Sequence, residues 1–192
     1  RLLKINCINK KYDFFYLEEN RQKSQLFMST FDSKKIIIGL NITGSSMEQR
    51  ISANDVKKIL LGLHSICNNI VVILLHKPSD KEWVNELISN DKSSYVFPSY
   101  PTESILDVAA IVDSVDLVIT PDTSIVHMAC ALNKPLIAIY KRDMEGFEAW
   151  KPKSKCNYVV FSEDFESLNY IDIDTVINKS LELIKMHIKK EL

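Results

Sequence analysis

Glycine is scarce in this sequence of 192 residues, with only four occurrences. Neither a G-x-G-x-x-G fingerprint nor a G-x-x-x-x-G-K-[ST] loop is present, which excludes the usual dinucleotide-binding and P-loop classes. Long hydrophobic runs are also missing, because no stretch approaches the ~20 apolar residues that a membrane-spanning helix needs. The composition, 46% hydrophobic and 26% charged, is ordinary for a globular domain with one core.

Cysteine is sparse and widely spaced, at Cys7, Cys67, Cys130 and Cys156. No C-x-x-C pair occurs, so neither a zinc site nor a disulfide framework is predicted, and the pattern is typical of a reducing cytoplasm.

Neither positive nor negative charge predominates in the sequence. The formal net charge is −1, and no basic patch carries interleaved aromatic residues, so nucleic acid is not expected as a partner.

From Lys34 onward, short β-branched apolar runs alternate with helical patterns. Nearly continuous apolar runs of this kind are typical of a parallel sheet that is covered on both faces. Strands and helices in alternation predict a doubly wound, Rossmann-like α/β fold. The six predicted strands are residues 35–40, 70–75, 95–97, 117–120, 136–140 and 158–161.

Polar residues mark the starts of the predicted helices. Ser52 and Ser79 each begin a stretch that resembles a capping box, and Thr102 can cap the helix that contains Ile105. Asp122 or Thr123 can cap a short helix that ends near residue 132, and a last helix begins near residue 172.

The first part of the chain differs from the rest. Residues 1–33 show no sustained periodicity, so we interpret them as a linker or a remnant of a missing amino-terminal acceptor domain, and residues 34–192 as the folded domain. The sequence opens with Arg1 and shows no signal-peptide cleavage site. We expect it to continue a longer protein.

Ligands bind doubly wound sheets at the carboxyl ends of the strands, so the loops there are the candidate site. After the first strand come Thr43, Gly44 and Ser45, followed by Arg50. Their hydroxyls and backbone N–H groups could receive phosphate oxygens, although a solvated loop explains the same residues.

Two further loops carry weaker signals. Asp80, after the second strand, could bind ribose hydroxyls or only cap a helix. Tyr100, after the third strand, could pack on a nucleotide base or only cover the edge of the sheet.

The turn after the fourth strand is the most informative. If a helix begins at Asp122 or Thr123, its first N–H groups and its dipole favour an anion there. Thr123 and Ser124 add hydroxyls, and His127 shares their helix face. The Asp122 carboxylate would repel a diphosphate placed too close, so it shapes the turn or binds a ligand hydroxyl. A capped helix with one partly exposed histidine explains the same residues.

Metal ligands are not apparent. No D-x-D pair and no His/Asp cluster at ligand spacing is present, and Asp113 and Asp116 fall at the amino ends of the strands. We therefore predict a site that uses no metal and no cofactor.

The stretch VDLVITPDTSIVHMACALNKPLIAIY, residues 115–140, is similar to the signature of the ADP-heptose:lipopolysaccharide heptosyltransferases, the ninth glycosyltransferase family. In that family a strand leads into Asp-Thr-(Gly/Ser)-x-x-His-x-Ala-(Ala)-Ala-Leu, then Pro and a final strand. The resemblance covers residues from about 34 to 190. The residues in register are Asp122, Thr123, Ser124, His127, Ala129, Ala131, Leu132 and Pro135.

The resemblance implies the carboxyl-terminal, donor-binding half of a GT-B glycosyltransferase. Such an enzyme transfers heptose or a related sugar from a nucleotide diphosphate, here ADP-heptose, to the core of lipopolysaccharide or lipooligosaccharide. The implied contacts to the diphosphate and donor sugar come from residues 43–45, residues 122–124 and His127, and Asp80 is the implied ribose ligand. Arg50 replaces the family's lysine, and residues 141–143 replace its Gly-Pro-Thr turn.

The resemblance also implies what this chain does not carry. The acceptor site and the general base belong to the amino-terminal half, so no catalytic residue is assigned here and the chain alone is expected to turn over little. The expected location is the cytoplasm, peripheral to the inner face of the bacterial inner membrane.

Two alternatives are open. One is a non-catalytic nucleotide-sugar-binding module of a larger assembly. The other is a GT-B-shaped sugar-nucleotide epimerase, which needs two carboxylates near the anomeric carbon, whereas only Asp122 is well placed.

Overall fold

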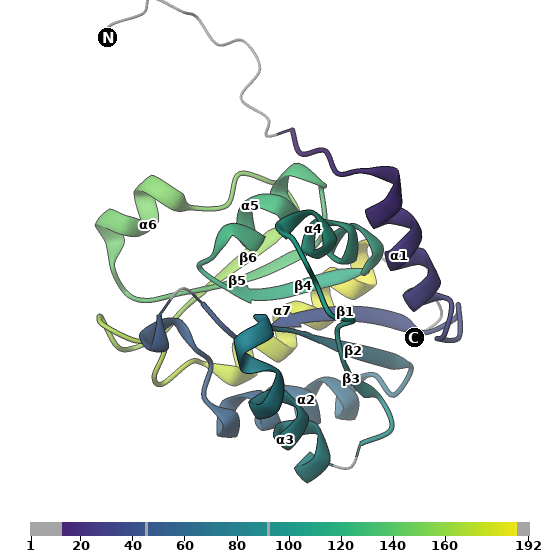
Figure 1. The fold of residues 1–192 in the computed structure, drawn as a ribbon. Helices are drawn as coiled ribbons and strands as arrows, with labels where there is room; N and C mark the ends of the chain where they lie inside the picture. Colours follow the sequence, from purple (N-terminus) through teal and green to yellow (C-terminus); the bar gives the residue numbers. More distant parts are fainter. Residues whose placement is uncertain (1–12, 45, 92, 188–192) are drawn as a thin grey trace, which may run out of the picture.

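A six-stranded parallel sheet forms the centre of the protein (Figure 1). The computed structural model describes residues 13–44, 46–91 and 93–187. The strand order is β3-β2-β1-β4-β5-β6, so the order reverses between β1 and β4. The strands are β1 (Ile36–Asn41), β2 (Ile70–Leu75), β3 (Val96–Pro98), β4 (Leu117–Pro121), β5 (Leu136–Tyr140) and β6 (Asn157–Phe161).

Each of the six predicted strands is confirmed, with bounds that differ by one residue at most. Every residue of β1, β2, β4 and β5 is buried. That burial on both faces explains why their sequences are apolar throughout rather than alternating. The doubly wound α/β class is therefore confirmed.

Helices cover both faces of the sheet, with α2, α3 and α7 on one and α1, α4 and α5 on the other (Figure 1). Each set closes its own hydrophobic core against the strands. The helices are α1 (Glu18–Met28), α2 (Ala53–Ile66), α3 (Lys81–Asp91), α4 (Ile105–Ser114), α5 (Ser124–Ala131), α6 (Met144–Trp150) and α7 (Ile173–His187), with the 3-10 turns η1 (Met47–Gln49) and η2 (Pro78–Asp80).

Two of the predicted helix caps are confirmed and two are wrong. Ser52 caps α2 by accepting from the N–H of Asp55, and Thr123 caps α5. The cap of α4 is Ser104 rather than Thr102, because the Ser104 hydroxyl reaches the third N–H of that helix. Ser79 caps nothing, since it lies inside η2, which continues directly into α3.

The polar stretch before residue 34 contains a helix that the sequence did not predict. Helix α1 packs along α4, and aromatic side chains around it, such as Phe27, join the core on that face. The assignment of residues 1–33 to a linker or a missing domain stays a prediction. Among the described residues, no helix has both the length and the apolar character needed to cross a bilayer.

Candidate functional site

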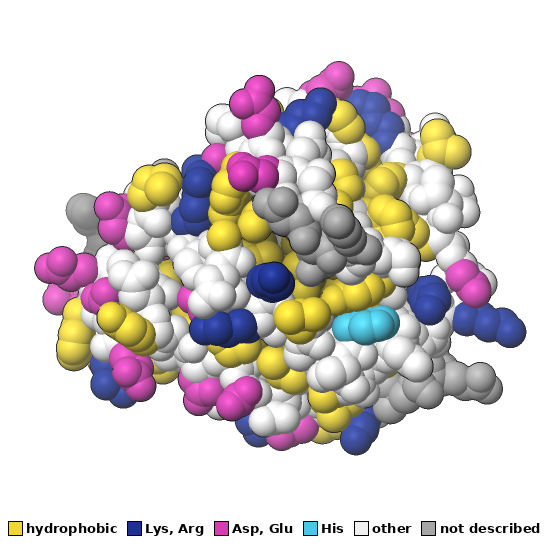
Figure 2. Space-filling view, turned by 90° about the horizontal axis from the view of Figure 1, so that it is seen from below, with side chains coloured by type: hydrophobic (Ala, Val, Ile, Leu, Met, Phe, Trp, Pro, Cys, Tyr) yellow, Lys and Arg dark blue, Asp and Glu magenta, His cyan; other side chains and the backbone are white. Residues whose placement is uncertain are grey.

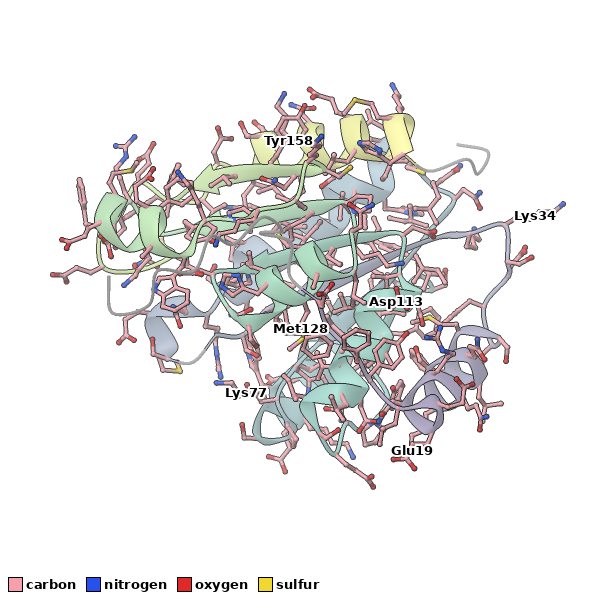
Figure 3. The ribbon with its side chains drawn as sticks, turned by 90° about the horizontal axis from the view of Figure 1, so that it is seen from above. Glu19, Lys34, Lys77, Asp113, Met128 and Tyr158 are labelled. Atoms are coloured by element: carbon pink, nitrogen blue, oxygen red, sulfur yellow. The ribbon has the colours of Figure 1, made fainter. Side chains whose placement is uncertain are left out.

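A cavity of about 730 Å³ opens at the carboxyl ends of β1 to β4, at the point where the strand order reverses. Figure 3 shows Lys77 at this end of the sheet, after β2, and Lys34 at the opposite end. The lining residues come from four strand-end loops and two helices: Asn41, Thr43, Gly44, Gln49, Leu75, His76, Lys77, Pro78, Ser99, Thr102, Glu103, Ser104, Ile105, Val108, Asp122, Thr123, Ser124 and Ile125. Such crevices are where doubly wound sheets bind ligands.

A buried hydrogen-bond network joins the ends of β1 and β4 beneath the cavity. The Asn41 amide Nδ2 donates to Thr120 Oγ1 at 2.9 Å and lies 3.4 Å from Thr123 Oγ1. The two threonine hydroxyls are 3.2 Å apart. Because Asn41 and Thr120 are buried, this network fixes the position of Thr123 relative to the sheet.

The loop after β1 folds tightly over the cavity. A Cβ on Gly44 would lie only 2.3 Å from the Cβ of Gln49, so a side chain at position 44 would push η1 away. Gln49 in turn donates to the backbone carbonyl of Asp122 at 3.4 Å, which ties this loop to the turn after β4. Thr43 is buried and lines the cavity, whereas Ser45 lies outside the described residues.

Helix α5 begins at the cavity. Thr123 Oγ1 accepts from the N–H of Ile125 at 3.3 Å, and Ser124 is exposed. The first turn of a helix presents N–H groups without helical partners, and its dipole favours negative charge there. The arrangement is suited to hold an anionic group of a ligand.

Asp122 lies on the cavity wall between β4 and α5. Burial raises the pKa of its carboxyl group, while His127, a hydrogen bond from the Tyr140 hydroxyl and Lys141 lower that pKa and Asp143 raises it. The net shift is upward, so the carboxyl group carries less negative charge at mildly acidic pH than a free aspartate does. His127 does not line the cavity; its ring packs edge-on to Trp150 with centroids 5.8 Å apart.

Arg50 and Asp80 bind each other rather than facing the cavity. The Arg50 Nη2 lies 2.6 Å from Asp80 Oδ1, and the guanidinium stacks 4.4 Å from the centre of the Trp83 ring. Neither residue lines the cavity. The ion pair joins the start of α2 to the start of α3.

Tyr100 also lies outside the cavity lining. Its hydroxyl donates to the backbone carbonyl of Asp107 at 3.3 Å, and its ring packs edge-on to Phe27 of α1. Burial, together with the nearby Asp107 charge, raises the pKa of Tyr100 to about 12.

Several lining residues were not assigned to the site from the sequence. His76 and Lys77 follow β2 directly, and that position alone could have indicated them. Asn41 ends β1 as its one polar side chain, which was a second available signal. Ser99, Thr102, Glu103 and Ser104 follow β3, where the sequence analysis selected only Tyr100, so position after a strand was the available signal for them as well.

Among the described residues, no group of three or more His, Cys, Asp or Glu side chains could hold a metal ion. On the face drawn in Figure 2, acidic and basic side chains are interspersed with hydrophobic ones, and the described residues show no continuous basic patch there. Asp113 and Asp116 lie before β4, at the amino end of the sheet, as predicted; Asp116 accepts from the N–H of Ile37.

Comparison with known proteins gives one family and several structures. Residues 8–170 match the family described as glycosyltransferase family 9 (heptosyltransferase). No curated protein sequence matches the chain.

Three similar structures illustrate the fold. A glycosyl transferase of family 9 from Veillonella parvula is 19% identical with a TM-score of 0.76, over 92% of this chain and 55% of that one. The E. coli ADP-heptose lps heptosyltransferase II is 20% identical with a TM-score of 0.70, over 90% and 53%. The E. coli heptosyltransferase WaaC with ADP is 19% identical with a TM-score of 0.64, over 83% and 48%. The chain thus spans about half the length of each.

Proposed function

Since the chain belongs to glycosyltransferase family 9, we propose that it is the donor-binding half of an enzyme that transfers heptose or a related sugar from ADP-heptose to the lipopolysaccharide core. The observation that carries the proposal is the cavity of about 730 Å³ at the point where the strand order reverses, with the start of α5 in its wall. Its volume falls within the range of small-molecule sites, about 300–1,000 Å³.

In this proposal the diphosphate lies against the first turn of α5. The Thr43 and Thr123 hydroxyls and the α5 N–H groups are the donors that face it, and Lys77, at the cavity rim, supplies a positive charge. Asp122 also lines the cavity, and its carboxylate would accept from a hydroxyl of the ligand rather than face the diphosphate. One of the similar E. coli enzymes was solved with ADP, which supports an adenine nucleotide as the ligand.

The chemistry that follows is departure of the nucleoside diphosphate. As the bond between the anomeric carbon and the diphosphate oxygen breaks, negative charge grows on the leaving group. Prepositioned N–H and hydroxyl donors stabilise that charge, in a step for which we propose no metal ion. Removal of the proton from the acceptor hydroxyl requires a base within hydrogen-bond reach. We assign the base and the acceptor site to the other half of the enzyme.

The proposal extends to location. We infer that the enzyme works in the cytoplasm at the inner face of the membrane, where a lipopolysaccharide core acceptor would be reached. Among residues 13–44, 46–91 and 93–187, no helix is long and apolar enough to span a membrane.

Calorimetric titration of the chain with ADP, UDP and GDP tests the proposal. We expect ADP to bind best, and Thr123→Ala to weaken binding while costing about 1 kcal/mol of stability as a lost helix cap. Ser52→Ala is the matched control, because it removes the cap of α2 away from the cavity and should leave ADP binding unchanged. Equal affinity of ADP for the wild type and Thr123→Ala would refute the proposed site.

A further inference from the structure

One wall of the cavity has no secondary structure of its own. Residues 99–104, which we term the β3–α4 wall, connect β3 to α4 and place Ser99, Thr102, Glu103 and Ser104 on the cavity lining. A segment without strand or helix hydrogen bonds takes its shape from the side chains that contact it. One group that contacts this wall is the carboxylate of Asp107.

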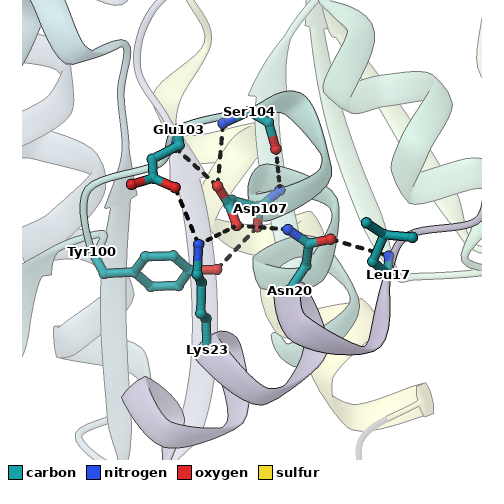
Figure 4. Close-up of polar contacts among 7 residues, drawn as sticks. All are labelled: Leu17, Asn20, Lys23, Tyr100, Glu103, Ser104 and Asp107. Carbon is teal, nitrogen blue, oxygen red and sulfur yellow. Dashed lines mark hydrogen bonds and ion pairs between the residues drawn. The ribbon is translucent and has the colours of Figure 1, made fainter.

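Asp107 does not line the cavity itself, but its carboxylate binds the wall. Its Oδ2 accepts from the backbone N–H of Glu103 at 2.9 Å and from that of Ser104 at 3.2 Å (Figure 4). The side chain is buried, with only 1% of the residue exposed. Burial raises the pKa of Asp107, but the hydrogen bonds from Asn20 and from the two wall N–H groups, with Lys23, bring the pKa below its ordinary value.

The other oxygen of Asp107 is bound by helix α1. Asn20 Nδ2 donates to Asp107 Oδ1 at 2.8 Å, across 87 positions of sequence. The Asn20 Oδ1 accepts from the N–H of Leu17 at 3.1 Å, so both ends of the amide are used and its orientation is fixed. Lys23 lies one turn further along α1, and its Nζ is 3.8 Å from Asp107 Oδ1 and 3.3 Å from Glu103 Oε2.

A second, apolar contact joins the same two parts. The Tyr100 ring, within the wall, packs against Phe27 of α1 with centroids 5.5 Å apart, and its hydroxyl donates to the Asp107 carbonyl. The wall therefore contacts α1 near its start, through Tyr100 and Phe27. Its end is bound by Asp107 of α4, which Asn20 of α1 contacts in turn (Figure 4).

We propose that helix α1 sets the shape of the nucleotide cavity, with Asn20 and Asp107 as positioning residues that act through the β3–α4 wall. Helix α1 precedes the first strand of the sheet, so displacement of the chain before residue 34 would change the wall and with it the affinity for the nucleotide. The inference rests on the proposed function for the identity of the ligand, but the coupling of α1 to the wall does not.

The physical reason is the cost of a buried charge. A carboxylate that loses one of its buried donors must either find another or turn toward water. If Asp107 turns, the N–H groups of Glu103 and Ser104 lose their acceptor, and the wall gains conformations in which it no longer lines the cavity. Coupling of this kind changes affinity by about 2- to 30-fold in other proteins.

The chain offers a matched control on the same helix. Ser24 of α1 is also buried, and its hydroxyl lies 3.1 Å from the Ala110 carbonyl and 2.8 Å from the Ser114 hydroxyl. Ser24→Ala therefore removes a polar contact between α1 and α4 at a distance from the wall. Asn20→Ala removes one that leads directly to it.

The experiment compares the wild type, Asn20→Ala and Ser24→Ala by amide hydrogen exchange and by titration with ADP. For Asn20→Ala we expect faster exchange at Glu103 and Ser104 and about fivefold weaker ADP binding. For Ser24→Ala we expect wild-type exchange at those two amides and wild-type affinity, even though its melting temperature falls. Asn20→Gln, which keeps the amide, should recover part of both.

Unchanged wall exchange in Asn20→Ala, or equal wall exchange in Asn20→Ala and Ser24→Ala, would overturn the inference. Faster exchange in Asn20→Ala with unchanged ADP affinity would also overturn it, because the wall would then not matter for binding. If the wild type binds no ADP, the proposed function fails, and the exchange data alone decide whether α1 holds the wall.

Discussion

The cavity has two sides that are built in different ways. On the β1 and β4 side, Asn41, Thr120 and Thr123 bond one another at the tips of adjacent strands. On the β3 side, the wall takes its shape from Asp107 and, through it, from Asn20 of a helix far away in sequence. The first side is specified by residues next to the strands, and the second by the capping box of α4, which a tertiary contact from Asn20 supports.

This difference decides how each side responds to change. A substitution on the β1 and β4 side should act on the ligand contacts directly and on a network in which Asn41 and Thr120 are buried. A substitution of Asn20 or Asp107 should change ligand affinity indirectly, by making the β3–α4 wall more mobile. Four substitutions test whether the first side is the more rigid one, in decreasing order of expected effect.

Gly44→Val should have the largest effect. The new side chain would occupy the place of Gln49, whose Cβ lies 2.3 Å from an added Cβ and whose backbone oxygen lies 2.8 Å from it. Overpacking of this kind costs about 1–3 kcal/mol, and displacement of η1 should abolish ADP binding. Thermal unfolding and calorimetry measure the two effects. Gly62→Val is the control, because its new side chain would clash with Ile177 of α7, away from the cavity. ADP binding by Gly44→Val at wild-type affinity would show that the loop is not part of the site.

Asn41→Ala should come next. The substitution leaves the buried Thr120 hydroxyl without its amide donor and frees Thr123 to rotate, at a cost of about 1–3 kcal/mol. We expect ADP affinity to fall about tenfold, which corresponds to 1.4 kcal/mol. The control is Asn69→Ala, because the Asn69 side-chain amide donates to the Lys34 carbonyl at the other end of the sheet. Titration of both variants with ADP separates a loss of binding at the site from a general loss of stability. Equal losses in both variants would contradict the rigid-side interpretation.

Asp122→Asn should stabilise the protein at neutral pH. Because the folded state raises the pKa of this carboxyl group, the folded state binds the proton more tightly, and stability falls as pH rises from the ordinary aspartate pKa through the folded one. Removing the charge should raise the melting temperature at pH 7 by less than about 4 °C, the shift that 1 kcal/mol gives in a chain of this size. The gain should vanish near pH 3. Glu163→Gln, at an exposed position, is the control, and a lower melting temperature at pH 7 in Asp122→Asn would contradict the sign.

Arg50→Ala should have the smallest effect. The Arg50–Asp80 pair is partly exposed, with side-chain exposures of 25% and 12%, and such pairs contribute less than about 1 kcal/mol. Because Arg50 does not line the cavity, ADP affinity should change less than twofold. Asp80→Asn should behave in the same way. A tenfold loss of affinity in either variant would restore these residues as ligands of the nucleotide.

The strands could be predicted well from the sequence, because a strand that is buried on both faces is apolar at nearly every position. It did not predict α1, since the two buried residues of that helix are polar, Asn20 and Ser24, and hydrophobic periodicity cannot find such a face. It also did not predict α6, which is a short helix whose residues are half-buried or exposed.

The same division applies to the site. Thr43, Gly44, Asp122, Thr123 and Ser124 follow β1 and β4 directly, and they line the cavity as their position at the strand ends indicated. Arg50 and Asp80 lie further into their loops, where they bind each other. Tyr100 lies as near to its strand as Thr43 does, but its ring packs against Phe27 of α1. Strand-end position therefore indicates which loops form the site, while tertiary contacts decide which of their side chains line it.

A crystal structure of the chain with ADP would show whether the diphosphate binds at the start of α5. We expect phosphate oxygens within about 3 Å of the Ser124 N–H and the Thr123 hydroxyl, with the nucleoside between β2 and the β3–α4 wall. Phosphates bound away from the first turn of α5, or a cavity closed by protein side chains when ADP is present, would contradict this expectation.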